Sequence, residues 1–436
     1  MKKYPLNKIT LKQLTEFLCV ILIGLMFVSK ISLKFIGVPR NFSFLIFQNG
    51  MHPFINFGLN FSIGAVLFFY FVKRKRLKNF KFIYVLLMLS MAAILTIQTL
   101  LQIAYVHPHN SVTLQMGGLI IALGVMLIYG IMMPDLFSTE KFVKAIRTFS
   151  VPLVVVSVLL LPVFNLHFFR GGRFIGVFKH IPHMVSASTF AYIFYFPELF
   201  NSKKPIVIRY LTILILLFAV FLTATKAAMV TVLMVTGMGM LTFGSKGKNS
   251  RIFKFLVVSL GGLFILLFGT QIFTFLYEVA SGQVGFLMRP PQDGIATRME
   301  EIYRGFKIFM QHPHLGQGIL YKFMSRSGIN VGGYNSFKDP HNIFVSAGVI
   351  GGWPYMIAIV TGFVLMIVGS IRGLFKGDIN TKIIAIFLIA HIPVFVIYHV
   401  HLSLGGMGDR MYWMIFGYLG LKELNKSKIL KNIKIS

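Results

Sequence analysis

Long apolar runs alternate with short polar segments along most of the chain, and this alternation predicts membrane-spanning helices. Crossing about 30 Å of hydrocarbon takes about 20 apolar residues in a helix. The runs lack the two-residue alternation of barrel strands. The pattern therefore predicts an all-α protein with about twelve spans in one membrane domain, residues 1–436. The approximate spans are 14–29, 54–72, 82–104, 114–132, 148–165, 184–199, 206–223, 227–243, 252–275, 343–369, 382–399 and 408–422.

One long polar excursion interrupts this pattern between residues 276 and 342. Within it, residues 298–311 carry apolar side chains at helical spacing, beginning with Met299, Ile302 and Phe306. That spacing predicts an amphipathic helix lying on the membrane surface. We expect the chemistry of the protein in this excursion, because it is the largest polar segment of the chain.

The composition excludes a soluble domain, since 56% of the residues are hydrophobic, only 13% are charged and the mean hydropathy is +0.77. If both termini are cytoplasmic, 28 of the 43 Lys and Arg residues fall in inner segments and 15 in outer ones. This bias predicts that orientation. Most of the net charge of +31 then faces anionic lipid, so the charge does not indicate nucleic acid as a partner.

A glycine-interrupted cationic loop separates the fifth and sixth predicted spans. It contains Arg170, Arg173 and Gly176 in the stretch RGGRFIG. Glycines let backbone N–H groups approach an anion closely, and Arg side chains fork onto phosphate oxygens. The sequence thus suggests a phosphate-binding loop, with an ordinary basic surface turn as the alternative.

Two other outer segments combine charge with a break between apolar runs. Lys226 lies between the seventh and eighth spans, where an ammonium group either snorkels to the interface or meets an anion. His399 and His401 precede Asp409 and Arg410, and the last two can satisfy each other as an ion pair. Three His-x-His spacings raise the question of zinc, but the few outer carboxylates form no recognisable ligand pattern. We therefore predict no metal.

The polar excursion contains short motifs in a defined order. They are Thr297-Arg298, Tyr303, His312-Pro313-His314-Leu315-Gly316-Gln317-Gly318 and Asp339-Pro340-His341-Asn342. Together, over roughly residues 290–352, they resemble the signature of the O-antigen ligase and Wzy-type polysaccharide polymerase family. Arg173-x-x-Gly176 and Thr225-Lys226-Ala227 resemble two upstream motifs of that family. Lys226 stands where Arg is usual, and Tyr303 stands where Trp is common.

The resemblance implies a GT-C-like glycosyltransferase in the bacterial cytoplasmic (inner) membrane, with its active site on the outer face. The implied substrates are a polyprenyl-diphosphate-linked oligosaccharide donor and a glycan acceptor. The outer face is short of carboxylates and rich in cations, so the cations themselves would stabilise the pyrophosphate leaving group. We expect no cofactor. A flippase and a chain-length regulator are candidate partners besides the lipid bilayer.

His341 is the candidate catalytic base, because an imidazole can accept a hydroxyl proton near neutral pH. The candidate pyrophosphate-binding residues are Arg173, Lys226 and Arg298, followed by Arg170 and Arg304. The candidate supporting residues are Asp339, Asn342, Gly176, Tyr303, His312, Gly316 and Gly318. Capping of the tenth span by His341 or Asn342, and a plain surface position for Arg298, are the alternatives.

Three functions stay open at this point. A polymerase would join lipid-linked repeat units, and the richness in Lys, Ile, Phe and Asn favours it by hinting at an AT-rich genome and an envelope without lipopolysaccharide. A ligase would transfer the glycan to lipid A core or another surface acceptor. A lipid-oligosaccharide flippase is the third, but the spans contain few charges and no internal repeat, unlike typical transporters.

Overall fold

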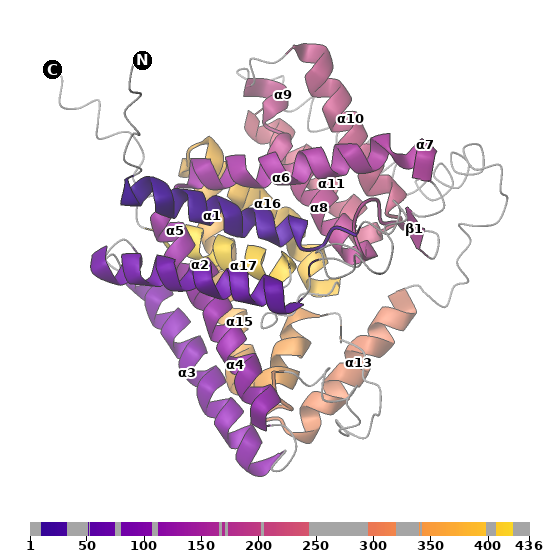
Figure 1. Cartoon of the computed structure of the whole chain (residues 1–436). Coiled ribbons are helices and arrows are strands. Elements are labelled where there is room, and N and C mark those ends of the chain that lie inside the picture. Colours follow the sequence, from indigo (N-terminus) through magenta and orange to yellow (C-terminus); the bar gives the residue numbers. More distant parts are fainter. Residues whose placement is uncertain are drawn as a thin grey trace, which may run out of the picture.

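The protein folds into a bundle of helices with one short hairpin in the part that the structure describes (Figure 1). This computed structural model describes residues 10–32, 51, 53–74, 80–106, 112–164, 168–170, 173–201, 205–243, 295–319, 340, 342–397 and 407–421. The predicted span at 252–275 lies outside the described residues, as do large parts of the excursion at 276–342.

The elements follow one another in this order, with the labels of Figure 1: α1 (Leu11–Val28), α2 (Pro53–Arg74), α3 (Phe82–Tyr105), α4 (Val112–Leu127), the π-helix η4 (Ile128–Met132), α5 (Met133–Leu136), α6 (Thr139–Leu159), α7 (Leu161–Phe164), β1 (Phe169–Arg170), β2 (Arg173–Phe174), α8 (Ile181–Tyr195), α9 (Glu198–Asn201), α10 (Ile206–Leu222), α11 (Lys226–Phe243), α13 (Ile295–Gln311), α15 (Ile343–Lys376), α16 (Ile379–Ile397) and α17 (Met407–Gly420).

The described helices make this a multi-pass membrane protein, as predicted. Six are long and apolar enough to cross a membrane, namely Leu11–Val28, Ile55–Lys73, Phe82–Tyr105, Gln115–Leu136, Thr139–Leu159 and Ile343–Lys376. Three shorter apolar helices are Ile206–Leu222, Ala227–Phe243 and Ile379–Ile392. The total of twelve spans, the GT-C-like arrangement and the orientation of the termini stay predictions.

Helix α6 differs from the span predicted at 148–165, because it starts at Thr139 and ends at Leu159. Its N-cap is Ser138, whose side chain accepts a hydrogen bond from the backbone N–H of Lys141. The first turns of this helix are charged, so hydropathy alone does not reveal where it begins.

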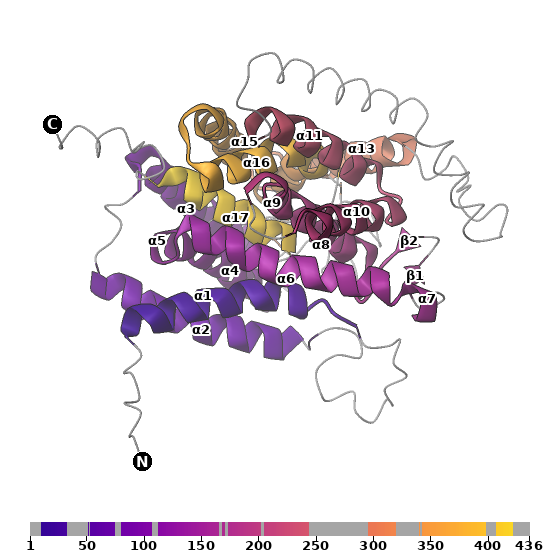
Figure 2. The ribbon, with the colours of Figure 1, turned by 90° about the horizontal axis from the view of Figure 1, so that it is seen from above.

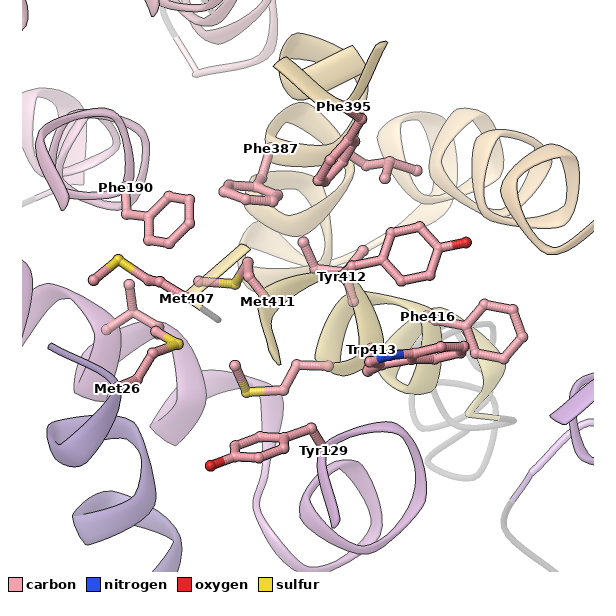
Figure 3. Packing of buried hydrophobic residues seen from close by; sticks show 14 of the residues in the cluster. Met26, Tyr129, Phe190, Phe387, Phe395, Met407, Met411, Tyr412, Trp413 and Phe416 are labelled. Atoms are coloured by element: carbon pink, nitrogen blue, oxygen red, sulfur yellow. The ribbon is translucent and has the colours of Figure 1, made fainter. Parts of the chain in front are cut away.

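Helix α17 forms the centre of the bundle, between α15 and α16 on one side and α1 and α6 on the other (Figure 2). Trp413 and its neighbours are fully buried, and Figure 3 shows them packed against residues of α1, η4, α8 and α16. Gly417 lies directly against the backbone carbonyl of Gly130 in η4. Small residues let helix backbones approach closely where no hydrophobic effect drives association.

Helices α3 and α17 run in opposite directions. Phe80, just before α3, forms a bridge with Leu421, just after α17, and Lys81 Nζ donates to the carbonyl of Leu419 at 2.8 Å. The end of α3 therefore lies at the end of the bundle where α17 begins. Gln102, in the last turn of α3, donates to the carbonyl of Ile350 at 2.7 Å, so the first part of α15 lies there too. We call this end of the bundle the site end.

Helices α8 and α11 also begin at the site end. The backbone N–H of Lys179, two residues before α8, donates to the carbonyl of Lys30 after α1, and Lys30 interacts electrostatically with Arg410 of α17. Tyr192 of α8 and Thr236 of α11 share a hydrogen bond of 2.7 Å, and one turn further on the ring of Phe196 lies against Gly239, so the two helices are parallel.

Candidate functional site

Helix α15 starts at the end of the polar excursion, directly after the candidate base. Its N-cap is Asn342, whose Oδ1 accepts hydrogen bonds of 3.0 Å from the backbone N–H groups of Phe344 and Val345. Between the two capping alternatives, the structure thus assigns the cap to Asn342. His341 and Asp339 lie outside the described residues, so their predicted contributions stay predictions.

Helix α15 breaks about two turns after its start, at Gly351 and Gly352. Gly352 has a φ of +67°, which strongly favours glycine. Gly316 has a φ of +74°, and a Cβ atom added there would lie 2.7 Å from the backbone nitrogen of Gly352. The predicted glycine motif at 312–318 is therefore packed, backbone against backbone, into the break of α15.

The break leaves backbone groups of α15 without partners inside the helix, and the motif supplies them. Pro354 has no N–H to donate to the carbonyl of Ile350. The N–H of Gly318 donates to that carbonyl at 3.2 Å, and the N–H of Gln317 donates to Val349 at 2.6 Å. In return, the N–H of Trp353 donates to the carbonyl of Pro313 at 2.7 Å.

Gln102 of α3 joins the motif to the break. Its amide nitrogen donates to the carbonyl of Leu315 and, at 2.7 Å, to that of Ile350. Gln102 is fully buried. The hydropathy pattern predicted the helix at this position but gave no function to the glutamine. The signal in the sequence was a pair of glutamines, Gln98 and Gln102, about one turn apart on the same face of an apolar helix. We infer that the motif at 312–318 stabilises the break of α15, the helix that begins after His341.

Helix α13 packs along the first turns of α15. A Cβ atom added at Gly305 would lie 2.5 Å from the Cβ of Pro340, the residue before His341. Further along, the ring of Phe309 meets Trp353 edge-on, with 4.7 Å between centroids. Arg298 lies two turns before Gly305, about 10 Å along the helix axis. Its backbone belongs to α13, but its side chain lies outside the described residues.

The apolar side chains of α13 divide between the bundle and the exposed surface. Ile308 and Phe309 are fully buried against the bundle, whereas Phe306 and Met310 are 43% and 46% exposed. Part of this helix therefore packs on protein, and the exposed apolar side chains leave the predicted contact with the membrane surface as a prediction.

The polar face of α13 holds its charges in local pairs. Arg304 forms an exposed ion pair with Glu300 one turn earlier. The ammonium group of Lys307 lies 4.6 Å from the ring centroid of Tyr303, which is 58% exposed. The side chain of His312, at the end of the helix, is exposed as well. An exposed pair of this kind contributes little to stability.

The predicted cationic loop forms the β1–β2 hairpin, in which Arg170 pairs with Arg173 in the antiparallel register. Gly176 follows in a left-handed turn with a φ of +52°. A Cβ there would lie 2.6 Å from Oγ of Ser157 in α6, and that Oγ accepts a bond from the N–H of Val177. Gly176 thus anchors the hairpin to α6. The side chain of Arg173 is partly buried, and that of Arg170 is not described.

Lys226 is the first residue of α11, directly after a tight turn. Ala224 has a φ of +49° in this turn, a conformation that costs free energy for a residue with a Cβ. The turn is fixed from within, since Thr223 is buried and Thr225 Oγ1 donates to its carbonyl at 3.1 Å. The side chain of Lys226 lies outside the described part of the chain.

These elements share the site end of the bundle. The hairpin contacts both α8 and α10, α8 and α11 begin at this end, and α15 begins there with Asn342 as its cap. Among the described residues, no three His, Cys, Asp or Glu side chains come together as a group that could hold a metal ion.

The structure adds three cations that the sequence analysis did not assign to the site. Lys30, Lys179 and Arg410 come from three separate parts of the chain and lie close to one another at the site end. The sequence signal was their position on the predicted outer face, against the usual charge bias. Their proximity to one another depends on tertiary packing.

Residues 211–360 match the family model described as O-antigen ligase. The chain carries a domain of the O-antigen ligase family. The resemblance drawn from the sequence motifs is thereby confirmed over this range, which begins in α10 and ends within α15. The O-antigen ligase domain includes Lys226, Arg298 and His341, whereas the hairpin with Arg173 precedes it. The family comprises membrane enzymes that process glycans, the ligases and polymerases. Among curated proteins, none matches the chain.

Proposed function

We propose that this protein is a membrane glycosyltransferase that joins polyprenyl-diphosphate-linked oligosaccharide repeat units into a surface polysaccharide. The observation that carries the proposal is the O-antigen ligase domain, whose matched range contains the candidate base and two candidate cations. Transfer to lipid A core or another surface acceptor is the second candidate function, because the same domain fits it equally well.

The reaction is a direct displacement at the anomeric carbon of the donor sugar. A hydroxyl of the acceptor attacks that carbon, and His341 accepts the proton of the hydroxyl as the new C–O bond forms. The bond from the anomeric carbon to the diphosphate oxygen breaks, and polyprenyl diphosphate leaves with the electron pair. Attack from the side opposite the leaving group inverts the configuration of that carbon.

The leaving group carries two to three negative charges, which the cations of the site end stabilise as they develop. Arg173 belongs to the hairpin, Lys226 is the first residue of α11 and Arg298 belongs to α13. Arg170 and Arg304 are the secondary candidates in this scheme. The step needs no metal in our proposal, since these cations take the part that a divalent ion plays elsewhere.

The experiment uses the full-length protein in lipid vesicles with a lipid-linked repeat unit. New glycosidic bonds between repeat units identify a polymerase, and bonds to an added lipid A core identify a ligase. Movement of the donor across the bilayer without bond formation would overturn the proposal and indicate a transporter.

The variant that tests the proposed base is His341→Ala. We expect no joined glycan, with donor binding still measurable. His314→Ala is the matched control, because His314 lies in the same segment, its side chain is exposed and its backbone carbonyl lies against Gly352 of α15. Wild-type rates in the His341 variant would remove the proposed base.

A further inference from the structure

The segment after α1 pairs with the segment before α8. The N–H of Ser32 donates to the carbonyl of Val177 at 2.8 Å, and the N–H of Lys179 donates to the carbonyl of Lys30 at 2.9 Å. Ile31 and Phe178 form the antiparallel bridge between these bonds. Lys30 and Lys179 are therefore directly opposite each other, with Cβ atoms roughly 5 Å apart.

Arg410 lies beside this pair, on the first turn of α17. It is 6% exposed, and its guanidinium carbon lies 5.3 Å from the ring centroid of Tyr129. The hydroxyl of Tyr129 donates to Oδ1 of Asn60 at 2.8 Å, which fixes the ring. The tyrosine belongs to the π-helix η4, an irregular turn that often occurs at functional sites. The guanidinium is thus held in a defined position next to Lys30.

Three cations accompany one carboxylate at this place. Asp409 is the acidic neighbour of Lys30, whereas Arg410 and Lys179 repel it. His180 and His183 lie next to the same lysines and add no negative charge. Neither Lys30 nor Lys179 forms a side-chain hydrogen bond or ion pair within the described ranges. Three cations and one carboxylate leave a net positive charge around Lys30, which is partly buried, and Arg410, which is buried, while Lys179 is exposed. Like charges directly opposite each other are destabilising.

The pKa of Lys30 shows that its charged form is destabilised in the folded protein. Burial, followed by repulsion from Arg410, lowers the pKa of Lys30 from 10.5 to about 8. The attraction of Asp409 only partly offsets these effects. A bound anion would remove the repulsion and let all three cations remain charged.

We propose that Lys30, Lys179 and Arg410 form a phosphate-binding site at the site end of the bundle, which we call the α1–α17 anion site. A phosphate group fits the chemistry, because two ammonium groups and a guanidinium can donate together to its several oxygens. The cations come from the segment after α1, the segment before α8 and the first turn of α17, so the site exists only in the folded bundle.

Two sources can supply such a phosphate next to a membrane. One is the diphosphate of the lipid-linked donor or of the released polyprenyl carrier, and this source rests on the proposed function. The other is the headgroup of an anionic phospholipid. Lys179 follows Phe174 of the hairpin by five residues. A carrier bound at Lys179 would therefore lie near the hairpin and the predicted donor site.

The test measures binding, so it does not depend on turnover. The probe is farnesyl diphosphate, a short polyprenyl diphosphate, added to the purified full-length protein in neutral-lipid nanodiscs at pH 7. We expect Lys30→Met to weaken its binding about tenfold, or about 1.4 kcal/mol, because the variant loses one charge-assisted hydrogen bond to the phosphate. Lys30→Arg should restore most of the affinity, which a purely structural loss would not.

The second arm replaces the neutral lipid by phosphatidylglycerol and counts bound lipid by native mass spectrometry. Loss of one retained phosphatidylglycerol in Lys30→Met, with unchanged farnesyl diphosphate binding, identifies the headgroup as the source. Lys144→Met is the matched control, since Lys144 is an exposed lysine near the start of α6, whereas the end of α6 lies at the hairpin. Unchanged binding of both probes in Lys30→Met and Lys179→Met would overturn the site.

The outcomes also separate this inference from the proposed function. If the wild-type protein joins no glycan but Lys30→Met and Lys179→Met lose phosphate binding, the anion site is supported and the proposed reaction is wrong. If the wild-type protein joins glycan and both variants bind the two probes normally, the proposed reaction is supported and the anion site is wrong.

Discussion

The backbone N–H of Trp353 donates a 2.7 Å hydrogen bond to the carbonyl of Pro313, so α15 is held at its break by the segment that follows α13. The break is thereby a defined part of the fold. It fixes the direction in which the first two turns of α15, capped by Asn342, leave the rest of the helix.

Replacing Gly316 by Ala should damage this arrangement. The added Cβ would sit 2.7–2.8 Å from backbone atoms of Gly351 and Gly352, in a left-handed conformation that Ala adopts poorly. We expect a loss of about 1–3 kcal/mol in stability, seen as a lower thermal midpoint, together with reduced glycan joining. Gly117→Ala in α4 is the control, because nothing lies within 4 Å of that position. An unchanged midpoint for Gly316→Ala would contradict the inference that the motif stabilises the break of α15.

The cap of α15 can be tested separately from catalysis. Asn342→Ala removes the acceptor for two backbone N–H groups and should cost about 1 kcal/mol. Asn342→Ser keeps a capping oxygen, so we expect both the thermal midpoint and the rate of glycan joining to recover. Recovery of the midpoint without recovery of the rate would assign the amide a contact with substrate.

The contact between α13 and Pro340 should control donor binding. Gly305→Ala forces the helix away from Pro340, and Arg298, two turns earlier, moves with it. If Arg298 binds the diphosphate, the KM for the lipid-linked donor rises while the protein stays folded. Gly58→Ala in α2 adds the same methyl group in open space and should leave the KM as it is. An identical KM in both variants would separate α13 from donor binding.

The charge of Lys30 predicts a dependence of stability on pH. Its pKa is lowered in the folded state, from 10.5 to about 8, so the unfolded chain binds the proton more tightly. The free energy of unfolding should therefore rise between about pH 8 and pH 10.5, as folded Lys30 loses its proton first.

Lys30→Met should remove this cost. The variant should be more stable than the wild type at pH 7, by at most about 3 kcal/mol, and the difference should shrink toward pH 10.5. Thermal midpoints in the absence of phosphate would measure it, with Lys144→Met as the control. The facing groups Arg410, Asp409, Lys179, His180 and His183 stay in place in both proteins. A constant difference across this range would contradict the assignment to Lys30.

Hydropathy by itself determined that the chain is an all-helical membrane protein and where most of its described helices lie. The apolar runs at 82–104 and 343–369 are long enough that only a spanning helix satisfies their backbone groups in lipid. The family resemblance also came from short motifs whose order can be read without coordinates. Asn342 was already a capping candidate, because its side chain and its position before an apolar run carry that signal.

Tertiary structure alone decided which groups meet. No sequence pattern joins Gln102 to the break of α15, or Lys30 to Lys179 and Arg410, since these residues lie far apart in the chain. The glycines at 316 and 318 read as part of a functional motif, yet both serve close packing. Gly316 lies against the backbone of Gly351 and Gly352, and Gly318 lies against the side chain of Gln115. Periodicity reports which side of a helix is apolar, but only the neighbouring helices determine what that side touches.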